Sequence, residues 1–245
     1  MLVLLELGGR RREVVESEGR GFVVRERCSL LSRRVWGFVV RERCSLLSRR
    51  VWGSLLSHRI ECSMSRIRIG NCSGFYGDRL SAMREMLEGG DLDVLTGDYL
   101  AELTMLILGR DQMRDPSLGY AKTFVRQVED SLGLALERGV RIVANAGGLN
   151  PSGLAQRLTD VARGLGLDPT IAYLEGDNLA ARAAEFGWTG ALTANAYLGA
   201  FEIAEALDEC ADIVVTGRVT DASLVVGPAI WWHGWTTTSY DAMAG

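Results

Sequence analysis

The chain has 245 residues, of which 47% are hydrophobic and 24% are charged, and its formal net charge at pH 7 is −4. These proportions are typical of a globular protein with a sizeable core, and they exclude wholesale disorder and a fibrous repeat. No apolar run approaches the roughly 20 residues that a membrane-spanning helix needs, so we expect no membrane association. The start of the chain lacks the basic residues of a secretory signal, and the five cysteines form no CxxC pair. Together these features predict a reduced, cytoplasmic protein without a structural zinc site.

The charge is divided unevenly along the chain. Residues 1–63 hold 13 arginines and 7 glutamates, a net charge of +6, whereas residues 64–245 carry a net charge of −10. The basic part contains the segment GFVVRERCSLLSRRVW twice without a change, at residues 21–36 and 37–52. A basic arm that binds nucleic acid would mix lysine with arginine, and structural repeats diverge at exposed positions. We therefore interpret residues 1–63 as a basic extension produced by a recent duplication or an early start codon, with no stable fold, and place an α/β domain at 64–245.

Strand and helix patterns alternate after Met64. Short apolar runs predict six strands, at residues 67–69, 92–96, 140–144, 170–174, 192–194 and 213–215. Helical spacing of apolar residues between and after them predicts crossover helices, and the Asn150-Pro151 pair is a strong helix start. This alternation predicts an α/β fold with a mainly parallel sheet of about six strands, an open Rossmann-like sheet rather than a closed barrel.

Every predicted strand ends in a small, polar segment. These segments are NCSG, TGD, NAGGLNP, EGD, NAYLG and TGRVTD. Gly, Asn and Asp also form ordinary turns and helix caps, so one such loop alone carries little information. Six on one edge of a parallel sheet favour a ligand site, because ligands bind beyond the carboxyl ends of the strands. The sequence predicts an anion-binding cradle of backbone amides at Asn145–Asn150, and the predicted ligand-binding residues are Ser73, Gly74, Asn145, Gly147, Gly148, Asn150, Asn195 and Arg218.

Three charged side chains at these strand ends are candidates for chemistry. Arg218 either clamps an acidic group of a ligand or pairs with Asp98 or Asp221 as a structural salt bridge. Asp98 and Asp221 are the candidate catalytic residues, as acid, base or metal ligand, and partial burial ahead of an apolar helix would suit Asp98 for proton transfer. For Asp177 we expect helix capping.

Two further reactive side chains receive smaller roles. Cys72 lies near a predicted helix start, where a thiolate would be favoured, but no histidine lies near it in the sequence. His233 lies among tryptophans and is expected to be packed rather than catalytic. The acidic body of the chain argues against nucleic acid as a partner, and no cofactor is indicated.

Five long segments resemble the acyclic terpene utilisation family, AtuA type. They are RIRIGNCSGFYGDRLSAMREM, DVLTGDYLAELTM, IVANAGGLNPSG, TANAYLGAFEIAEAL and ADIVVTGRVTDASLVVGPA, in that order from about Ile67 to Trp235. The resemblance implies a role in the catabolism of acyclic terpenes and related branched acids as CoA thioesters. It also implies that residues 1–63 have no counterpart in the family and that the chain is truncated at its C-terminus, because family members continue beyond the WWHGW segment.

The function predicted from these observations is that of an enzyme, or the N-terminal part of one, that acts on an acidic or CoA-thioester substrate. A non-catalytic subunit that binds acyl-CoA or assists assembly in the same pathway is the alternative. The expected partner is a small-molecule acid or acyl-CoA, and a homo-oligomer is compatible with the sequence.

Overall fold

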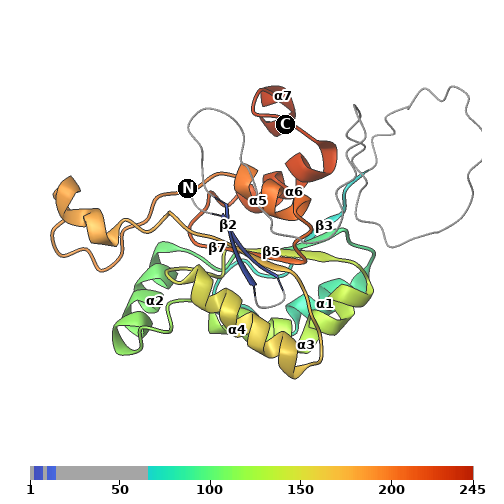
Figure 1. Ribbon diagram of the computed structural model, residues 1–245, viewed down its shortest axis with the longest axis horizontal. Helices are drawn as coiled ribbons and strands as arrows, with labels where there is room; N and C mark the ends of the chain where they lie inside the picture. Colours follow the sequence, from blue (N-terminus) through green and yellow to red (C-terminus); the bar gives the residue numbers. More distant parts are fainter. Residues whose placement is uncertain (1–2, 8–9, 15–65, 245) are drawn as a thin grey trace, which may run out of the picture. The chain divides into compact units, whose positions relative to one another are not determined.

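A computed structural model of the chain describes residues 3–7, 10–14 and 66–244 (Figure 1). Five parallel strands form the centre of the sheet, in the spatial order β3-β4-β5-β7-β6. Their bounds are β3 Ile69–Asn71, β4 Val94–Gly97, β5 Arg141–Ala144, β6 Ile171–Leu174 and β7 Ile213–Thr216. The sheet is open, and the prediction of an α/β fold with crossover helices is confirmed.

Two strands from the basic N-terminal part extend this sheet. Strand β1 (Val3–Leu7) pairs antiparallel with β6, and β2 (Arg10–Val14) pairs antiparallel with β1. These two strands were not predicted from the sequence. The tandem repeat at residues 21–52 lies outside the described residues.

Helices cover both faces of the sheet (Figure 1). One face carries α1 (Ala82–Gly89), α3 (Lys122–Glu137) and α4 (Pro151–Gly164), and the opposite face carries α5 (Phe201–Asp208) and α6 (Ser223–His233). Successive strand residues point to opposite faces, and so Leu95 and Ile142 pack in the first layer of core whereas Val94 and Val143 pack in the second. The remaining helices are α2 (Glu102–Arg114), the 3-10 helix η1 (Ala180–Phe186) and α7 (Tyr240–Ala244).

The strand predicted at residues 192–194 is wrong. Residues 191–199 form a loop with two isolated bridges, which join Asn178 to Asn195 and Leu198 to Val219. Leu192 and Thr193 pack against α2, where a Cβ atom added to Gly109 would come within 2.9 Å of the Thr193 methyl group. The parallel sheet therefore has five strands rather than six. Over the same described ranges, no helix is long and apolar enough to cross a membrane.

Candidate active site at the carboxyl edge of the sheet

The strand order places a topological switch point between β5 and β7. The helix that follows β5, α4, packs on one face of the sheet, and the helix that follows β7, α6, packs on the other face. Neighbouring strands whose connections leave toward opposite faces open a crevice at their carboxyl ends, and ligands of open α/β sheets bind in such crevices. The loop after β5 begins with Asn145 and the loop after β7 contains Arg218. The backbone thus brings two of the predicted ligand-binding residues to the switch point.

Asp98 and Asn145 form a hydrogen-bonded pair at this edge. Asn145 is fully buried, its Nδ2 donates to Asp98 Oδ1 over 2.7 Å, and its Oδ1 accepts from the Tyr99 amide over 2.7 Å. The Leu100 amide also donates to Asp98 Oδ1, and the Asp98 amide donates to the Ser73 carbonyl. Asn145, at the end of β5, and the Leu100 amide therefore fix the orientation of the Asp98 carboxylate, while its Oδ2 accepts no hydrogen bond within the described residues.

Arg218 lies close to this pair and is almost completely buried. Its side chain is 6% exposed, its Nη1 donates to the Leu100 carbonyl over 2.7 Å, and its Nη2 donates to the Tyr197 hydroxyl. The guanidinium carbon lies 4.4 Å from the centre of the Tyr197 ring. The backbone of Leu100 therefore connects Asp98 with Arg218, because its amide donates to Asp98 and its carbonyl accepts from Arg218. No ion pair joins Arg218 to Asp98 or Asp221 in the described part of the chain, so the predicted alternative of a structural salt bridge with either residue is wrong.

Asp177 fixes the backbone of Arg218 by accepting a hydrogen bond from its amide. Its carboxylate is buried, and Oδ2 accepts hydrogen bonds of 2.8 Å from the Arg218 amide and from Asn195 Nδ2. Burial raises the pKa of Asp177 above the usual value for a carboxyl group, because the charged form is desolvated. A side chain at Gly217 would collide with this carboxylate, which explains the glycine. The expectation that Asp177 caps a helix is wrong, since its partners are a distant strand end and the loop that carries Tyr197.

The remaining predicted side chains lie at the same edge without joining the cluster. Asp221 is exposed in the loop after β7, and no hydrogen bond or ion pair among the described residues connects its side chain with Asp98 or Arg218. Ser73 is buried and its Oγ donates to the Phe75 carbonyl. Gly74 is exposed, and its amide donates to the Asp78 carboxylate. Ser73 thus contributes to the candidate site through its carbonyl, which orients Asp98.

The predicted cradle of free amides at Asn145–Asn150 is wrong. The Gly147 amide donates to the Thr216 carbonyl, the Leu149 amide to the Gly119 carbonyl, and the amides of Gly148 and Asn150 to carbonyls within the loop. Gly147 is required because a Cβ atom would lie 2.6 Å from the Thr216 carbonyl oxygen, and Gly148 has a φ of +55°. Asn150 caps α4 by accepting from the Gly153 amide over 2.9 Å, as its position before Pro151 predicts. The amides of these four residues are therefore already paired within the protein.

Cys72 and His233 are not arranged for chemistry. Burial raises the pKa of the Cys72 thiol to about 11, which opposes the thiolate that a helix start would favour. His233 is exposed at the end of α6, and its ring stacks on that of Trp235 with the ring centroids 5.1 Å apart. Within the described ranges, no group of three or more His, Cys, Asp or Glu side chains could hold a metal ion.

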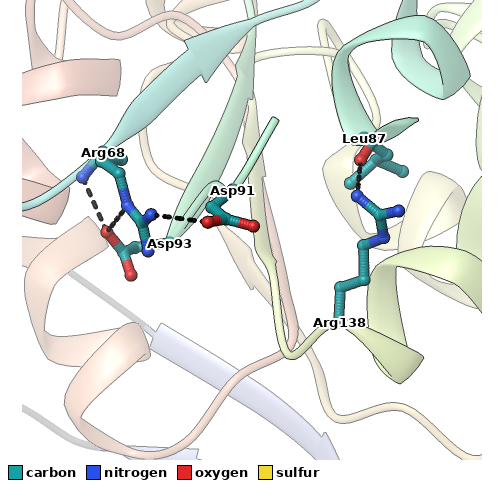
Figure 2. A network of polar contacts seen from close by, with 5 residues as sticks. All are labelled: Arg68, Leu87, Asp91, Asp93 and Arg138. Atoms are coloured by element: carbon teal, nitrogen blue, oxygen red, sulfur yellow. Dashed lines mark hydrogen bonds and ion pairs between the residues drawn. The ribbon is translucent and has the colours of Figure 1, made fainter. Parts of the chain in front are cut away.

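The arginines at the opposite edge of the sheet have close partners (Figure 2). Arg68, just before β3, donates from its amide to Asp93 over 2.7 Å and from Nη1 to Asp91 over 3.2 Å. Arg138 donates to the Leu87 carbonyl. Arg68 is half exposed and pairs with two carboxylates, whereas Arg218 is buried and, among the described residues, has one carboxylate within 4 Å, that of Glu102 at 3.9 Å. The two edges therefore differ in how their cations are compensated.

Two residues of this cluster, Tyr197 and Glu102, were missed in the sequence, and Asp177 was given another role. Tyr197 and Glu102 contact Arg218, and Asp177 fixes its backbone. The only signal for Tyr197 was its place in the NAYLG segment, which was assigned to a strand end that does not exist. The contact between Glu102 and Tyr197 joins residues that are 95 positions apart, which no local pattern reveals.

The comparison with known proteins identifies a family for most of the described chain. No curated protein and no solved structure matches the chain significantly. The family model described as "Acyclic terpene utilisation family protein AtuA" matches residues 67–245, the part that forms the parallel sheet and its helices. The chain therefore belongs to the AtuA family.

Proposed function

We propose that the protein acts in acyclic terpene utilisation and binds the acidic group of a small-molecule acid or its CoA thioester at the β5–β7 switch point. The family membership supports the pathway. The observation that carries the site is Arg218, a guanidinium whose side chain is 6% exposed and whose nearest carboxylate in the described chain is 3.9 Å away. Removing a cation from water is costly unless an anion compensates it, so this arrangement favours an anionic ligand.

In this proposal Asp98 is the general acid or base that transfers a proton to or from the substrate. Asn145 and the Leu100 amide hold Asp98 Oδ1, and in this proposal the other oxygen, Oδ2, accepts the proton of the ligand. A fixed carboxylate beside a cation that binds the substrate is the arrangement that general acid–base catalysis needs. Asp221, on the loop that follows Arg218, is the second candidate carboxylate. We further propose that the protein works in the cytoplasm on a small molecule, without nucleic acid.

The alternative is a non-catalytic subunit that binds an acyl-CoA or assists assembly at the same edge. It is supported by the position of Asp221, since no hydrogen bond or ion pair in the described ranges joins this second carboxylate to Asp98. The two functions share the anion site and differ only in turnover.

Turnover by the full chain distinguishes the two functions. The chain is incubated with a panel of branched acids and their CoA thioesters, and both binding and product formation are measured for the wild type, Asp98→Asn and Arg218→Ala. The enzyme proposal predicts that Asp98→Asn keeps binding but loses turnover at least about a hundredfold, the usual contribution of a general acid or base. Asp160→Asn, on the exposed surface of α4, is the matched control and should behave as the wild type. Binding without turnover across the panel would favour the subunit, and equal binding by Arg218→Ala would refute the site.

A further inference from the structure

Glu102 lies where an anionic group would meet the Arg218 site. It is in the first turn of α2, and its Oε1 lies 3.2 Å from the Tyr197 hydroxyl and 3.9 Å from Arg218 Nη2. Its own backbone amide, the Tyr197 hydroxyl and Arg218 all lower the pKa of Glu102, so it is present as a carboxylate at neutral pH. A carboxylate therefore already contacts the outer side of the site.

The two side chains of this ion pair differ strongly in exposure, unlike those of two ion pairs on the surface. The side chains of Arg84 and Glu88 are 47% and 54% exposed, and those of Arg182 and Glu185 are 59% and 58% exposed. For Arg218 and Glu102 the values are 6% and 88%. The cation is fixed in the protein while its partner extends from solvent, so Glu102 can move away at little cost and Arg218 cannot.

The Tyr197 hydroxyl determines which group fits this position. Its oxygen accepts a hydrogen bond from Arg218 Nη2, so its single proton points outward and donates to Glu102 Oε1. Tyr197 is 52% exposed, so this proton is open to a ligand. One donor polarised by a cation matches one carboxylate oxygen, whereas a phosphate group has three oxygens to satisfy and finds few donors here.

We infer that Glu102 occupies the position of the ligand's own acidic group, and that the Arg218–Tyr197 site is specific for a monocarboxylate that displaces it. This inference rests on the proposed function, and it adds the class of the acidic group and a residue that sets its affinity. Glu102 competes with the ligand, because both are acceptors for the same hydroxyl proton and both are attracted to the same cation. Replacing its charge by a neutral amide should therefore strengthen binding of a carboxylate.

The inference is tested by titrating the full chain with 3-methylbutanoate and, separately, with inorganic phosphate, using ligand-observed saturation-transfer NMR. Glu102→Gln should lower the Kd for 3-methylbutanoate roughly fivefold, as expected for removing one exposed charge about 4 Å from a cation in a water-like dielectric. Glu185→Gln, an exposed glutamate on η1 that also pairs with an arginine, is the matched control and should leave the Kd unchanged. Tyr197→Phe should weaken binding, since the hydroxyl proton is lost.

The outcomes separate this inference from the proposed function. If Glu102→Gln binds 3-methylbutanoate no more tightly than the wild type while Arg218→Ala loses binding, the role of Glu102 is refuted and the anion site stands. If phosphate binds to Glu102→Gln more tightly than 3-methylbutanoate does, the assignment to a monocarboxylate is refuted. If Arg218→Ala binds as the wild type does, or if no variant binds either probe, both the inference and the proposed anion site fail.

Discussion

Replacing Arg218 and Arg141, one buried and one partly buried arginine at opposite edges of the sheet, by alanine distinguishes a ligand-binding residue from a structural one. Arg218 is at the carboxyl edge, and Arg141 is at the amino end of β5, where Nη1 donates to the carbonyls of Cys210 and Ala211 and pairs with Asp212. Their side chains are 6% and 19% exposed, so burial alone predicts that Arg218→Ala is the more damaging change. We predict the opposite order, because the two guanidinium groups differ in their partners.

The magnitudes follow from the partners of each guanidinium. Arg218→Ala loses the hydrogen bonds to the Leu100 carbonyl and the Tyr197 hydroxyl, worth about 1 kcal/mol each. It also removes a buried cation whose nearest carboxylate in the described chain is beyond hydrogen-bond distance, and this offsets part of the loss. We therefore expect the free energy of unfolding to change by no more than about 1 kcal/mol, or about 3 °C in Tm. Arg141→Ala leaves Asp212 without its cation and removes the hydrogen bonds from the guanidinium to two carbonyls, which should cost about 2–3 kcal/mol, or about 5–10 °C.

The assay combines thermal unfolding with binding of the branched-acid panel. Arg218→Ala should lose binding by about tenfold or more, which is about 1.4 kcal/mol, while Arg141→Ala should bind normally at temperatures below its transition. If Arg218→Ala unfolds at a lower temperature than Arg141→Ala and still binds the panel, Arg218 is a structural residue and its assignment to ligand binding is refuted.

Three other variants or treatments test local features of the fold. Gly148→Val should destabilise the fold by several kcal/mol, because the position has a φ of +55° and a Cβ atom would lie 2.7 Å from the Gly119 carbonyl oxygen. The control is Gly133→Ala, in open space on α3, which should raise the Tm slightly in the same unfolding assay. Burial raises the pKa of Cys72 to about 11, so Cys72 should resist iodoacetamide at pH 8 in the folded chain and react after unfolding. Peptide mass spectrometry checks this, and modification of Cys72 in the native chain would contradict it. Burial and neighbouring carboxylates raise the pKa of Glu205, so its ionisation costs stability as the pH rises above the pKa of the unfolded chain. Glu205→Gln should therefore raise the Tm at pH 7 but not at pH 3, and an equal gain at both pH values would show another cause.

The parallel sheet could be predicted because its strands are defined locally. Val140–Ala144 and Ile213–Val215 are short apolar runs bounded by glycine or polar residues, and each falls within a residue or two of the observed strand. Residues 192–194 are also a short, mainly apolar run, but Leu192 and Thr193 pack on Gly109 of α2 rather than beside a strand. A run of three residues cannot distinguish these outcomes, because the deciding contact comes from a helix some 80 residues earlier.

The edge of the sheet that holds the candidate site could be predicted from the sequence, but the contacts within the site could not. Parallel strands all end at one edge, so Asp98, Asn145 and Arg218 were brought to one place by topology alone. Which amides remain free depends on acceptors from elsewhere, and the carbonyls of Thr216 and Gly119 pair the amides that the local sequence left available. The partners of Arg218 could not be foreseen for the same reason.

We propose that residues 1–63 are an extension outside the α/β domain, although β1 and β2 lie within them. Removing them leaves the edge of β6 without its antiparallel partner β1. A chain that begins at Met64 should nonetheless melt no lower than the full chain if the five parallel strands and their helices hold the core. A clear loss of Tm, or resistance of the repeat at residues 21–52 to trypsin, would contradict this proposal.

An amide chemical-shift map of the full, ¹⁵N-labelled chain titrated with 3-methylbutanoate tests the proposed anion site most directly, because it locates the bound acid without assuming a reaction. We predict that the largest shifts fall on Leu100, Asn145, Tyr197 and Arg218, around the β5–β7 switch point, and that they disappear in Arg218→Ala. Shifts confined to the amino edge around Arg68, Arg138 and Arg141, or no saturable shifts at all, would contradict it.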